Sequence, residues 1–243
     1  MTLKLFGETP ELQETLTEAW GEIISFFPGL SHLADADGLQ IFLCTPRTFE
    51  RVRFELYLED DVKGVYNAMA LCGYPGIALE SEYFLAHEVG HWLNSAFERL
   101  HAGPLYRRRV FSDLIRQALD CYTRCEVIEK TENEPGEVFA RLFETGIAYL
   151  AMDADPECYP ASTLPNHVDH SYCGDGDDPT YHPNYVHGFE WVDGYHAAWL
   201  RSTRRAINDT LKGADRLRSE STSLLWRINY GDKTFEDVFV NKT

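Results

Sequence analysis

The sequence predicts an α+β fold in which a short mixed sheet precedes a half-buried helix and the rest of the chain is mainly helical. Residues 52–79 contain several short runs of strand-forming residues, and residues 80–99 carry apolar side chains at the spacing of an amphipathic helix. Longer segments after residue 112 repeat this helical spacing. We expect residues 1–154 to form the core of the fold. Residues 155–243, a loop-rich and helical part, are expected to pack on that core as one compact unit.

Composition places the chain among well-packed globular proteins and narrows its partners. Hydrophobic residues make up 44% of the 243 residues and aromatic residues 13%, which is typical of a globule and not of a disordered chain. A formal net charge of −17 argues against nucleic acid or an anionic membrane as the main partner. No apolar run is long enough for a transmembrane span, and the first residues lack the pattern of a signal peptide. We therefore expect a cytoplasmic location; an effector delivered by another route would look the same.

The first predicted elements are a helix, a strand and a connection. Residues 9–26 repeat apolar side chains at helical spacing, with Thr9 as the expected N-cap and Pro10 at the first helical position. Residues 39–44 form a continuous apolar run that is typical of a strand. Residues 46–51 are predicted to be a short connection.

Three further strands are predicted ahead of the next helix. Residues 52–58 alternate in the pattern of a half-buried strand, and residues 64–68 and 76–79 are shorter candidates. Residues 72–76, which contain two glycines and a proline, are typical of a turn between the last two strands.

The helix that follows contains an H-E-x-x-H pattern, formed by His87, Glu88 and His91. Because residues four apart lie on one face of a helix, the two imidazoles can share a metal ion. Glu88 lies about 100° further round the helix, close enough to hold a water bound to that ion. A catalytic zinc site needs this set, together with a third protein ligand and one open position. The sequence therefore predicts Zn²⁺ as a cofactor, with His87 and His91 as ligands and Glu88 as the general base.

The surroundings of the pattern support a half-buried helix. Residues 80–82 provide an N-cap candidate and an acidic first turn. Gly90, between the two histidines, costs about 1 kcal/mol of helix propensity relative to alanine. That cost is understandable if another element approaches the helix closely at this point. The alternative is an ordinary core helix with two hydrogen-bonded histidines.

The H-E-x-x-H helix and the later segment 133–144 (Asn-Glu-Pro-Gly-Glu-Val-Phe-Ala-Arg-Leu-Phe-Glu) together resemble the zincin metallopeptidases of gluzincin type. The later segment is similar to the E-x-F-A-x-x-F-E helix of anthrax-lethal-factor-like peptidases and of metallopeptidases of phages and mobile elements. This resemblance spans about residues 52–152. It implies a zincin-like fold with an edge strand beside the H-E-x-x-H helix, peptidase activity, and Glu137 as the third zinc ligand. Otherwise Glu137 is a solvated carboxylate near the N-terminus of a helix that runs to about residue 152.

One position departs from the lethal-factor pattern. That type carries an acid four residues after the ligand, where it contacts a zinc-bound histidine; this chain has Arg141. Some other group must then orient the imidazoles, since their outer hydrogen bonds fix the tautomer. Glu144, two turns after Glu137 on the same face, is the alternative third ligand, and Glu134 comes after it.

Residues 155–188 are rich in proline and histidine, which is typical of a functional loop that could form one wall of a cleft. His167, His170 and Cys173 could bind a second, structural zinc ion, although only three ligands are in view. The acidic run 175–178 lacks the spacing of a calcium-binding loop.

Zincins often place a tyrosine or histidine beside the metal to stabilise the oxyanion that forms during hydrolysis. The candidates here are Tyr149, Tyr181, Tyr185 and His187, each of which could instead be a packed or surface side chain.

The remaining segments are predicted to be mainly helical. Residues 112–130 form a long helix candidate, and residues 191–217 form a second that carries several arginines. We expect the second to dock on the core, its arginines offsetting the acidic remainder of the chain. Residues 224–240 contain short strand candidates.

These observations predict a zinc metallopeptidase that hydrolyses protein or peptide substrates through a zinc-bound water activated by Glu88. An alternative of another class is a catalytically silent, zinc-stabilised binding or structural protein with a zincin fold, such as an accessory protein of a phage or mobile element. A third is a zinc hydrolase that acts on a non-peptide amide.

Overall fold

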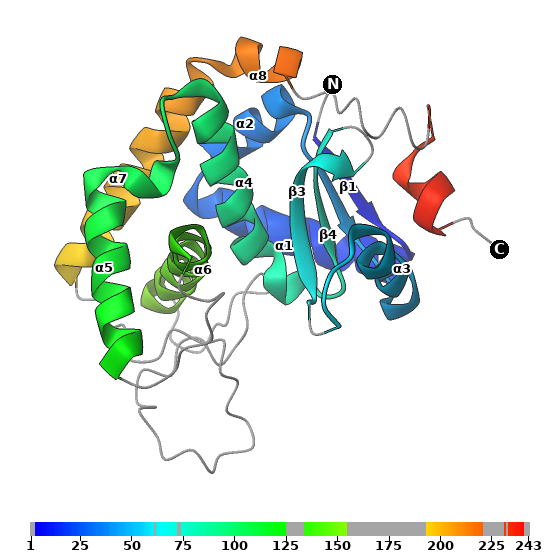
Figure 1. The fold of residues 1–243 in the computed structure, drawn as a ribbon, viewed down its shortest axis with the longest axis horizontal. Coiled ribbons are helices and arrows are strands. Elements are labelled where there is room, and N and C mark those ends of the chain that lie inside the picture. Colours follow the sequence, from blue (N-terminus) through cyan, green and yellow to red (C-terminus); the bar gives the residue numbers. More distant parts are fainter. Residues whose placement is uncertain are drawn as a thin grey trace.

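The protein folds as a small four-stranded sheet with helices packed on both of its faces (Figure 1). The computed structural model describes residues 3–60, 62–71, 74–124, 134–154, 193–220, 231 and 233–240. The strands are β1 (Lys4–Gly7), β2 (Gln40–Leu43), β3 (Gly64–Leu71) and β4 (Tyr74–Leu79). The α-helices are α1 (Pro10–Phe26), α2 (Gly29–Asp37), α3 (Pro46–Leu56), α4 (Leu85–Leu100), α5 (Arg109–Arg124), α6 (Pro135–Ala154), α7 (Asp193–Leu211) and α8 (Ala214–Glu220). Short 3-10 helices span Glu82–Phe84 and Leu105–Arg107, and a π-helical turn, η5, spans Glu236–Val240.

The sheet is mixed and its strand order is β1-β2-β4-β3. The strands β1, β2 and β4 are parallel, whereas β3 lies at one edge, antiparallel to β4. In β2, Ile41 and Leu43 join the large core under most of the helices, and Phe42 between them joins a smaller core with α3 and η5. β4 divides its side chains in the same way. Burial on both faces explains why these strands are continuously apolar in the sequence.

The predicted α+β class is confirmed in its coarse form, a mainly helical protein with a small mixed sheet. The first helix begins as predicted, with Thr9 accepting a hydrogen bond from the backbone N–H of Leu12 and Pro10 at its first position. The strands predicted at 64–68 and 76–79 are present as β3 and β4. The strand β1 and the helix α2 were not predicted.

Two predictions for the segment before β3 were wrong. Residues 46–51, predicted as a connection, and residues 52–58, predicted as a strand, lie largely in the helix α3. The buried side chains of this helix are Thr48, Phe49 and Val52, and the two apolar ones stand three apart, as a helix requires. Phe54, which the alternating pattern would have buried with Val52, is 81% exposed. The alternation was therefore a coincidence on an amphipathic helix.

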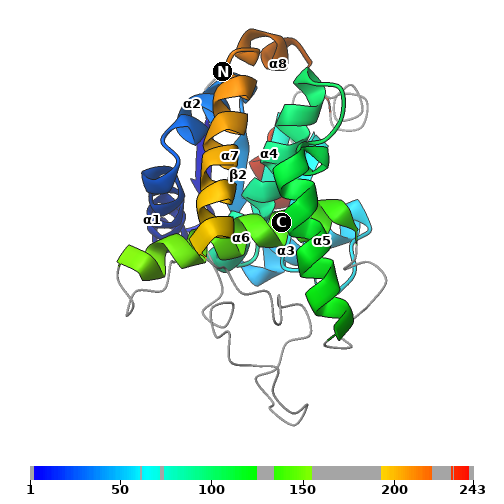
Figure 2. The same cartoon turned by 90° about the vertical axis from the view of Figure 1, so that its left-hand side faces the viewer.

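The later helices form a layer beyond α4 and away from the sheet (Figures 1 and 2). The helix α7 begins at Asp193, packs against α2, α4, α5 and α6, and buries Trp199 and Ile207 in the large core. Its Arg201, Arg204 and Arg205 are exposed, in agreement with a docking helix that keeps its cations in solvent. The predicted strand at 224–240 is wrong for 236–240, which are helical, and residues 224–230 lie outside the described part of the chain.

No helix in the described ranges is both long enough and apolar enough to cross a membrane.

The helix α6 lies between α5 on one side and α1 and α4 on the other (Figure 1). It approaches α4 closely at Gly90, as the sequence predicted for this glycine. A Cβ atom at Gly90 would lie 2.9 Å from the Cα atom of Ala140 and 3.1 Å from the Cβ atom of Phe143. Real Cβ atoms do not come so close to a neighbouring backbone, so this contact between the two helices requires glycine.

The contact at Gly90 gives a stability prediction. Gly90→Ala should lower the free energy of unfolding by up to about 2 kcal/mol. The added methyl group must push α6 away from α4, which costs about 1–3 kcal/mol, and the gain of about 1 kcal/mol in helix propensity offsets only part of this cost. Urea denaturation of the metal-free protein, followed by circular dichroism, measures the change.

The matched control is Gly21→Ala on α1, where no atom lies within 4 Å of the added Cβ. This control should be as stable as the wild type or more stable by about 0.5–1 kcal/mol. A Gly90→Ala variant that gained stability like the control would show that the two helices are not in tight contact.

Candidate metal centre

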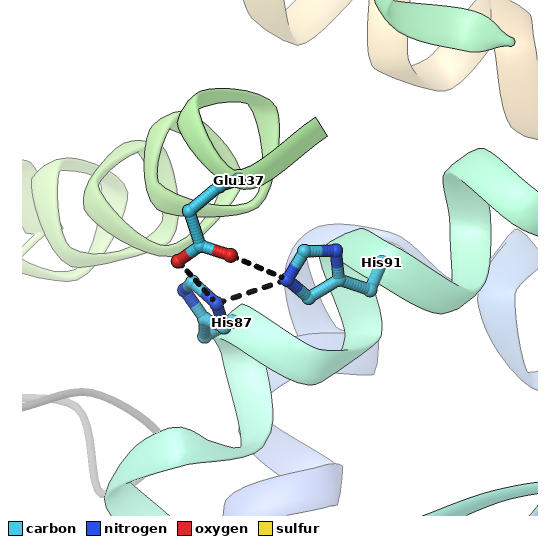
Figure 3. A group of neighbouring side chains, drawn as sticks. All are labelled: His87, His91 and Glu137. Atoms are coloured by element: carbon cyan, nitrogen blue, oxygen red, sulfur yellow. Dashed lines mark hydrogen bonds and ion pairs between the residues drawn. The ribbon is translucent and has the colours of Figure 1, made fainter. Parts of the chain in front are cut away.

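Two helices bring three donor side chains to one point (Figure 3). His87 and His91 stand one turn apart on α4, and their Nε2 atoms are 3.1 Å apart. Glu137, from the first turn of α6, faces both rings. Its Oε1 atom is 3.2 Å from Nε2 of His87, and its Oε2 atom is 3.2 Å from Nε2 of His91. Among the described residues, no other group of three or more His, Cys, Asp or Glu side chains is arranged to hold a metal ion.

The spacing of the donors fits a tetrahedral zinc ion. Ligand atoms that lie about 2.0–2.1 Å from zinc at tetrahedral angles are separated from one another by about 3.3 Å. The two Nε2 atoms are 3.1 Å apart and each is 3.2 Å from its nearer Glu137 oxygen, separations within a few tenths of an ångström of this value. Two imidazoles and one carboxylate are also the ligand set of a common class of catalytic zinc sites. The three residues therefore fit zinc in both chemistry and geometry.

The outer ring nitrogen of His87 is held by a second carboxylate. Glu144, which is 3% exposed, places Oε2 3.5 Å from Nδ1 of His87. A proton on Nδ1 that is directed at this carboxylate leaves the lone pair of Nε2 for a metal ion. Glu144 therefore lies behind the imidazole and not among the three donors, so it is placed to orient a ligand and not to be the third ligand. Glu134, the other alternative, is exposed and is not part of the cluster.

Charges at the cluster favour a cation. Burial raises the pKa of Glu137, but His87 and the hydrogen bonds to both imidazoles outweigh burial and hold this pKa well below its usual range. Burial lowers the pKa of His87, but the carboxylates of Glu137, Glu144 and Glu88 outweigh burial and raise this pKa well above its ordinary value. The site thus combines an ionised carboxylate with imidazoles in a negative environment.

Glu88 belongs to α4, and its carboxylate lies against the edge strand β3. It is 6% exposed and accepts a hydrogen bond from the backbone N–H of Tyr66 on β3. The Cα–H of Gly64, at the start of β3, faces its carboxylate: a Cβ atom there would be 3.0 Å from Oε1 of Glu88. Burial raises the pKa of Glu88, and the nearby His87 and His91 offset only part of this rise. A buried carboxylate with a raised pKa is suited to proton transfer near neutral pH.

Of the predicted oxyanion-stabilising side chains, Tyr149 alone falls in the described part of the chain, and it does not lie at this cluster. Tyr149 stands twelve residues after Glu137, about 18 Å further along α6. Its ring packs against His196, with 4.4 Å between the ring centroids. The other oxyanion candidates and the predicted second zinc site lie outside the described residues: Tyr181, Tyr185, His187, His167, His170 and Cys173.

No pattern in the sequence indicated that Gly64 and the N–H of Tyr66 help to position Glu88. A glycine at the start of a strand has many explanations, and a backbone N–H has no side-chain signature at all. The orienting role of Glu144 was also missed. Its spacing of seven residues from Glu137 had placed it on the correct face of the helix, but as an alternative ligand.

Comparison with known proteins adds no assignment: no family model, no curated protein and no solved structure matches this chain.

The geometry predicts the order in which carboxylate substitutions weaken zinc binding. Glu144→Gln, which weakens the hold on His87, should raise the dissociation constant for zinc about 10–100-fold. Glu137→Gln should raise it further, because it removes a ligand and not only the support of one. Competition with a chromophoric chelator at fixed pH measures both constants.

Glu134→Gln is the matched control, since Glu134 immediately precedes the same helix but is exposed. Its zinc affinity should equal that of the wild type. If Glu144→Gln weakened zinc binding more than Glu137→Gln did, the roles assigned to the two carboxylates would have to be exchanged.

Proposed function

We propose that the protein is a zinc-dependent metallohydrolase and that its substrates are peptides. The observation that carries this proposal is the convergence of His87, His91 and Glu137, beside the buried carboxylate of Glu88, at the spacing of zinc ligands. The residues at this site match the zincin motifs in type and order.

The exposure of the donors favours a catalytic site over a structural one. Structural zinc sites are closed by four protein ligands, whereas catalytic sites have three and keep one position open. The described residues place three donors here, and the side chains of His91 and Glu137 are still 27% and 28% exposed. Water and a substrate can therefore reach the cluster from solvent.

Each residue of the site would have a separate role in hydrolysis. When bound, zinc would act as a Lewis acid that polarises a carbonyl group and lowers the pKa of water to about 7. His87, His91 and Glu137 would hold the ion, and Glu144 fixes the tautomer of His87. Glu88 would accept the proton of the attacking water and transfer it to the leaving amine. The N–H of Tyr66 holds the Glu88 carboxylate in place for both transfers.

The position of β3 supports a peptide as the substrate. This strand lies at the edge of the sheet and packs against α4, and Gly64 at its start faces the carboxylate of Glu88. An edge strand can pair with an extended peptide through backbone hydrogen bonds. A peptide bound along β3 would pass close to the donor cluster.

Replacement of the general base tests the proposal directly. Glu88→Gln should retain zinc at the wild-type stoichiometry but lower kcat for peptide cleavage about 10²–10⁴-fold. The measurement is cleavage of a diverse library of quenched fluorescent peptides, together with elemental analysis of the protein. Wild-type activity should be abolished by a chelator and restored by zinc.

The other functions predict different results in the same assay. A zinc-stabilised binding protein would contain zinc but cleave no peptide, and a hydrolase for other amides would cleave only non-peptide substrates. Peptide turnover that survived in Glu88→Gln would remove Glu88 from the role of general base. A wild-type protein that bound no zinc would overturn the proposal as a whole.

A second prediction concerns the glycine that faces Glu88. The added Cβ of Gly64→Ala would lie 3.0 Å from Oε1 and 3.2 Å from Cγ of Glu88, and 3.0 Å from Cβ of Phe84, so these neighbours, the carboxylate included, must shift by a few tenths of an ångström. We expect kcat to fall by about tenfold, because misplacement by 1 Å costs about 10²-fold. Zinc affinity should be unchanged, since no donor atom is touched. Steady-state kinetics and chelator competition measure the two effects.

Gly136→Ala, beside Glu137, is the control, because its Cβ would meet only a ring atom of Tyr106 at 3.8 Å. Equal kcat values for Gly64→Ala and the wild type would show that the position of Glu88 does not depend on β3.

A further inference from the structure

The outer face of α3 carries the two most exposed aromatic side chains of the described part of the chain. Phe54 is 81% exposed and Tyr57 is 94% exposed, whereas the other exposed aromatic side chains, Tyr83 and Tyr195, are 37% and 42% exposed. Both lie at the C-terminal end of the helix, three residues apart. A single exposed apolar residue is ordinary, but two neighbouring aromatic rings left in water are typical of a surface that binds a partner.

The backbone of Tyr57 points to a contact with a partner and not to a role in the fold. Tyr57 is the C-cap of α3, with φ of 56° and ψ of 40°, the left-handed conformation. In the described ranges it is the only residue other than glycine with a positive φ. Glycine is usual at this position of a helix, because a Cβ atom is strained there. A tyrosine that is strained and almost fully exposed contributes little to stability, so a partner accounts for it better.

A hollow adjoins these rings. It has a volume of about 500 Å³ and lies between α3 and η5, with Arg47, Arg51 and Phe54 on one side and Val238 and Phe239 on the other. Pockets of about 300–1,000 Å³ hold ligands, so an aromatic side chain of a partner fits this one. The helix α3 and η5 cover the side of the sheet that faces away from α4 (Figure 1). This surface is therefore separate from the candidate metal centre.

The charges along α3 indicate which partner fits. Residues 46–53 contain three arginines and one acid, whereas residues 54–60 contain three acids and no cation. Arg47 in the first turn and Glu55 in the last turn each stand where the helix dipole disfavours their charge, so helix stability does not explain them. Among the described residues, no acidic side chain pairs with Arg47. A second α3 that runs antiparallel brings its acidic end to this basic end, so the helix is complementary to itself.

We propose that this surface is the interface of a homodimer, in which two α3 helices pack antiparallel about a two-fold axis. An axis near Arg51 places Arg47 of each copy opposite Glu55 of the other copy. Phe54 of each copy then enters the hollow of the other, where the guanidinium groups of Arg47 and Arg51 can lie over its ring. One short helix and one turn from each copy make a small interface, so we expect a dissociation constant of about 1–100 μM.

Sedimentation velocity of the full chain, from about 1 to about 500 μM, measures the association. The buffer contains a chelator, because the surface lies away from the donors and this inference does not rest on the proposed function. The wild type should change from monomer to dimer over this range. Phe54→Ala should raise the dissociation constant at least about tenfold, because the ring that fills the hollow is lost. Tyr195→Ala, which removes an exposed aromatic ring on α7, is the control and should associate like the wild type.

Charge reversal tests the antiparallel arrangement. In a dimer of Arg47→Glu copies, and in a dimer of Glu55→Arg copies, both contacts across the axis join like charges. Each variant alone should therefore associate at least about tenfold more weakly than the wild type. In an equimolar mixture of the two variants, both contacts of a mixed dimer join opposite charges, so association should return to about the wild-type level. Circular dichroism checks that the variants fold, as expected for side chains on the outer face of a helix.

The outcomes decide the proposal. A wild-type chain that stayed monomeric across this range would overturn the homodimer and leave the surface to a different protein. A dimer that Phe54→Ala did not weaken would place the interface elsewhere on the molecule. A mixture of the two charge-reversed variants that associated no better than either alone would overturn the antiparallel pairing of the helices.

Discussion

The close contact of α4 and α6 is the constraint on which the candidate metal centre depends. The donors come from two helices that are distant in the sequence, so the relative position of those helices fixes the distances between the donors. The contact is made by Gly90, next to His91, and by Ala140, nearly one turn after Glu137. The point of closest approach and the donor atoms therefore lie on the same turns. A larger side chain at Gly90 would separate the helices at the place where an ångström matters most.

The other end of α4 is fixed by a buried ion pair. Asp37, at the end of α2, is fully buried and accepts hydrogen bonds from Nε1 of Trp92 and from both terminal nitrogens of Arg99. Removing one partner from a buried pair of this kind costs about 3–5 kcal/mol. Because Trp92 follows His91 directly, its bond to Asp37 also fixes the rotation of α4 about its own axis. Packing at Gly90 sets how far α4 stands from α6, and Asp37 sets which way the histidines point.

Much of the site could be predicted from the sequence, because its signals are local. The spacing of His87 and His91 places both rings on one face of any helix, and Gly90 carries the signature of a close approach. Glu137 was different: its place depends on the packing of two helices, and it was found through the resemblance to zincins. The role of Glu144 was missed, because periodicity gives the face of a helix but not the distance at which a carboxylate meets a ring.

The errors in the predicted fold have the same origin, since they too concern features that tertiary packing decides. For α3, a strand was predicted from an alternating pattern, although helical spacing and an N-cap were also present. Thr45 accepts a hydrogen bond from the N–H of Thr48, and Pro46 stands at the first helical position. A short amphipathic segment satisfies both periods, and only the core it packs against decides between them. The strand β1 was missed because its four residues, each half-buried, form no apolar run. Its pairing with β2 comes from tertiary contacts.

The charge distribution suggests how a very acidic protein can keep a cation site selective. With a net charge of −17, exposed carboxylates occur over much of the chain, yet such groups bind divalent ions only weakly when each is surrounded by water. At the cluster the carboxylates are instead held at fixed distances by His87, Arg141 and the backbone of Tyr66. Each carboxylate has a partner that sets its direction, so the proposed ion would be selected by the fixed positions of its ligands more than by their negative charge. Imidazole nitrogens add preference for zinc over the calcium and magnesium that carboxylates alone would attract.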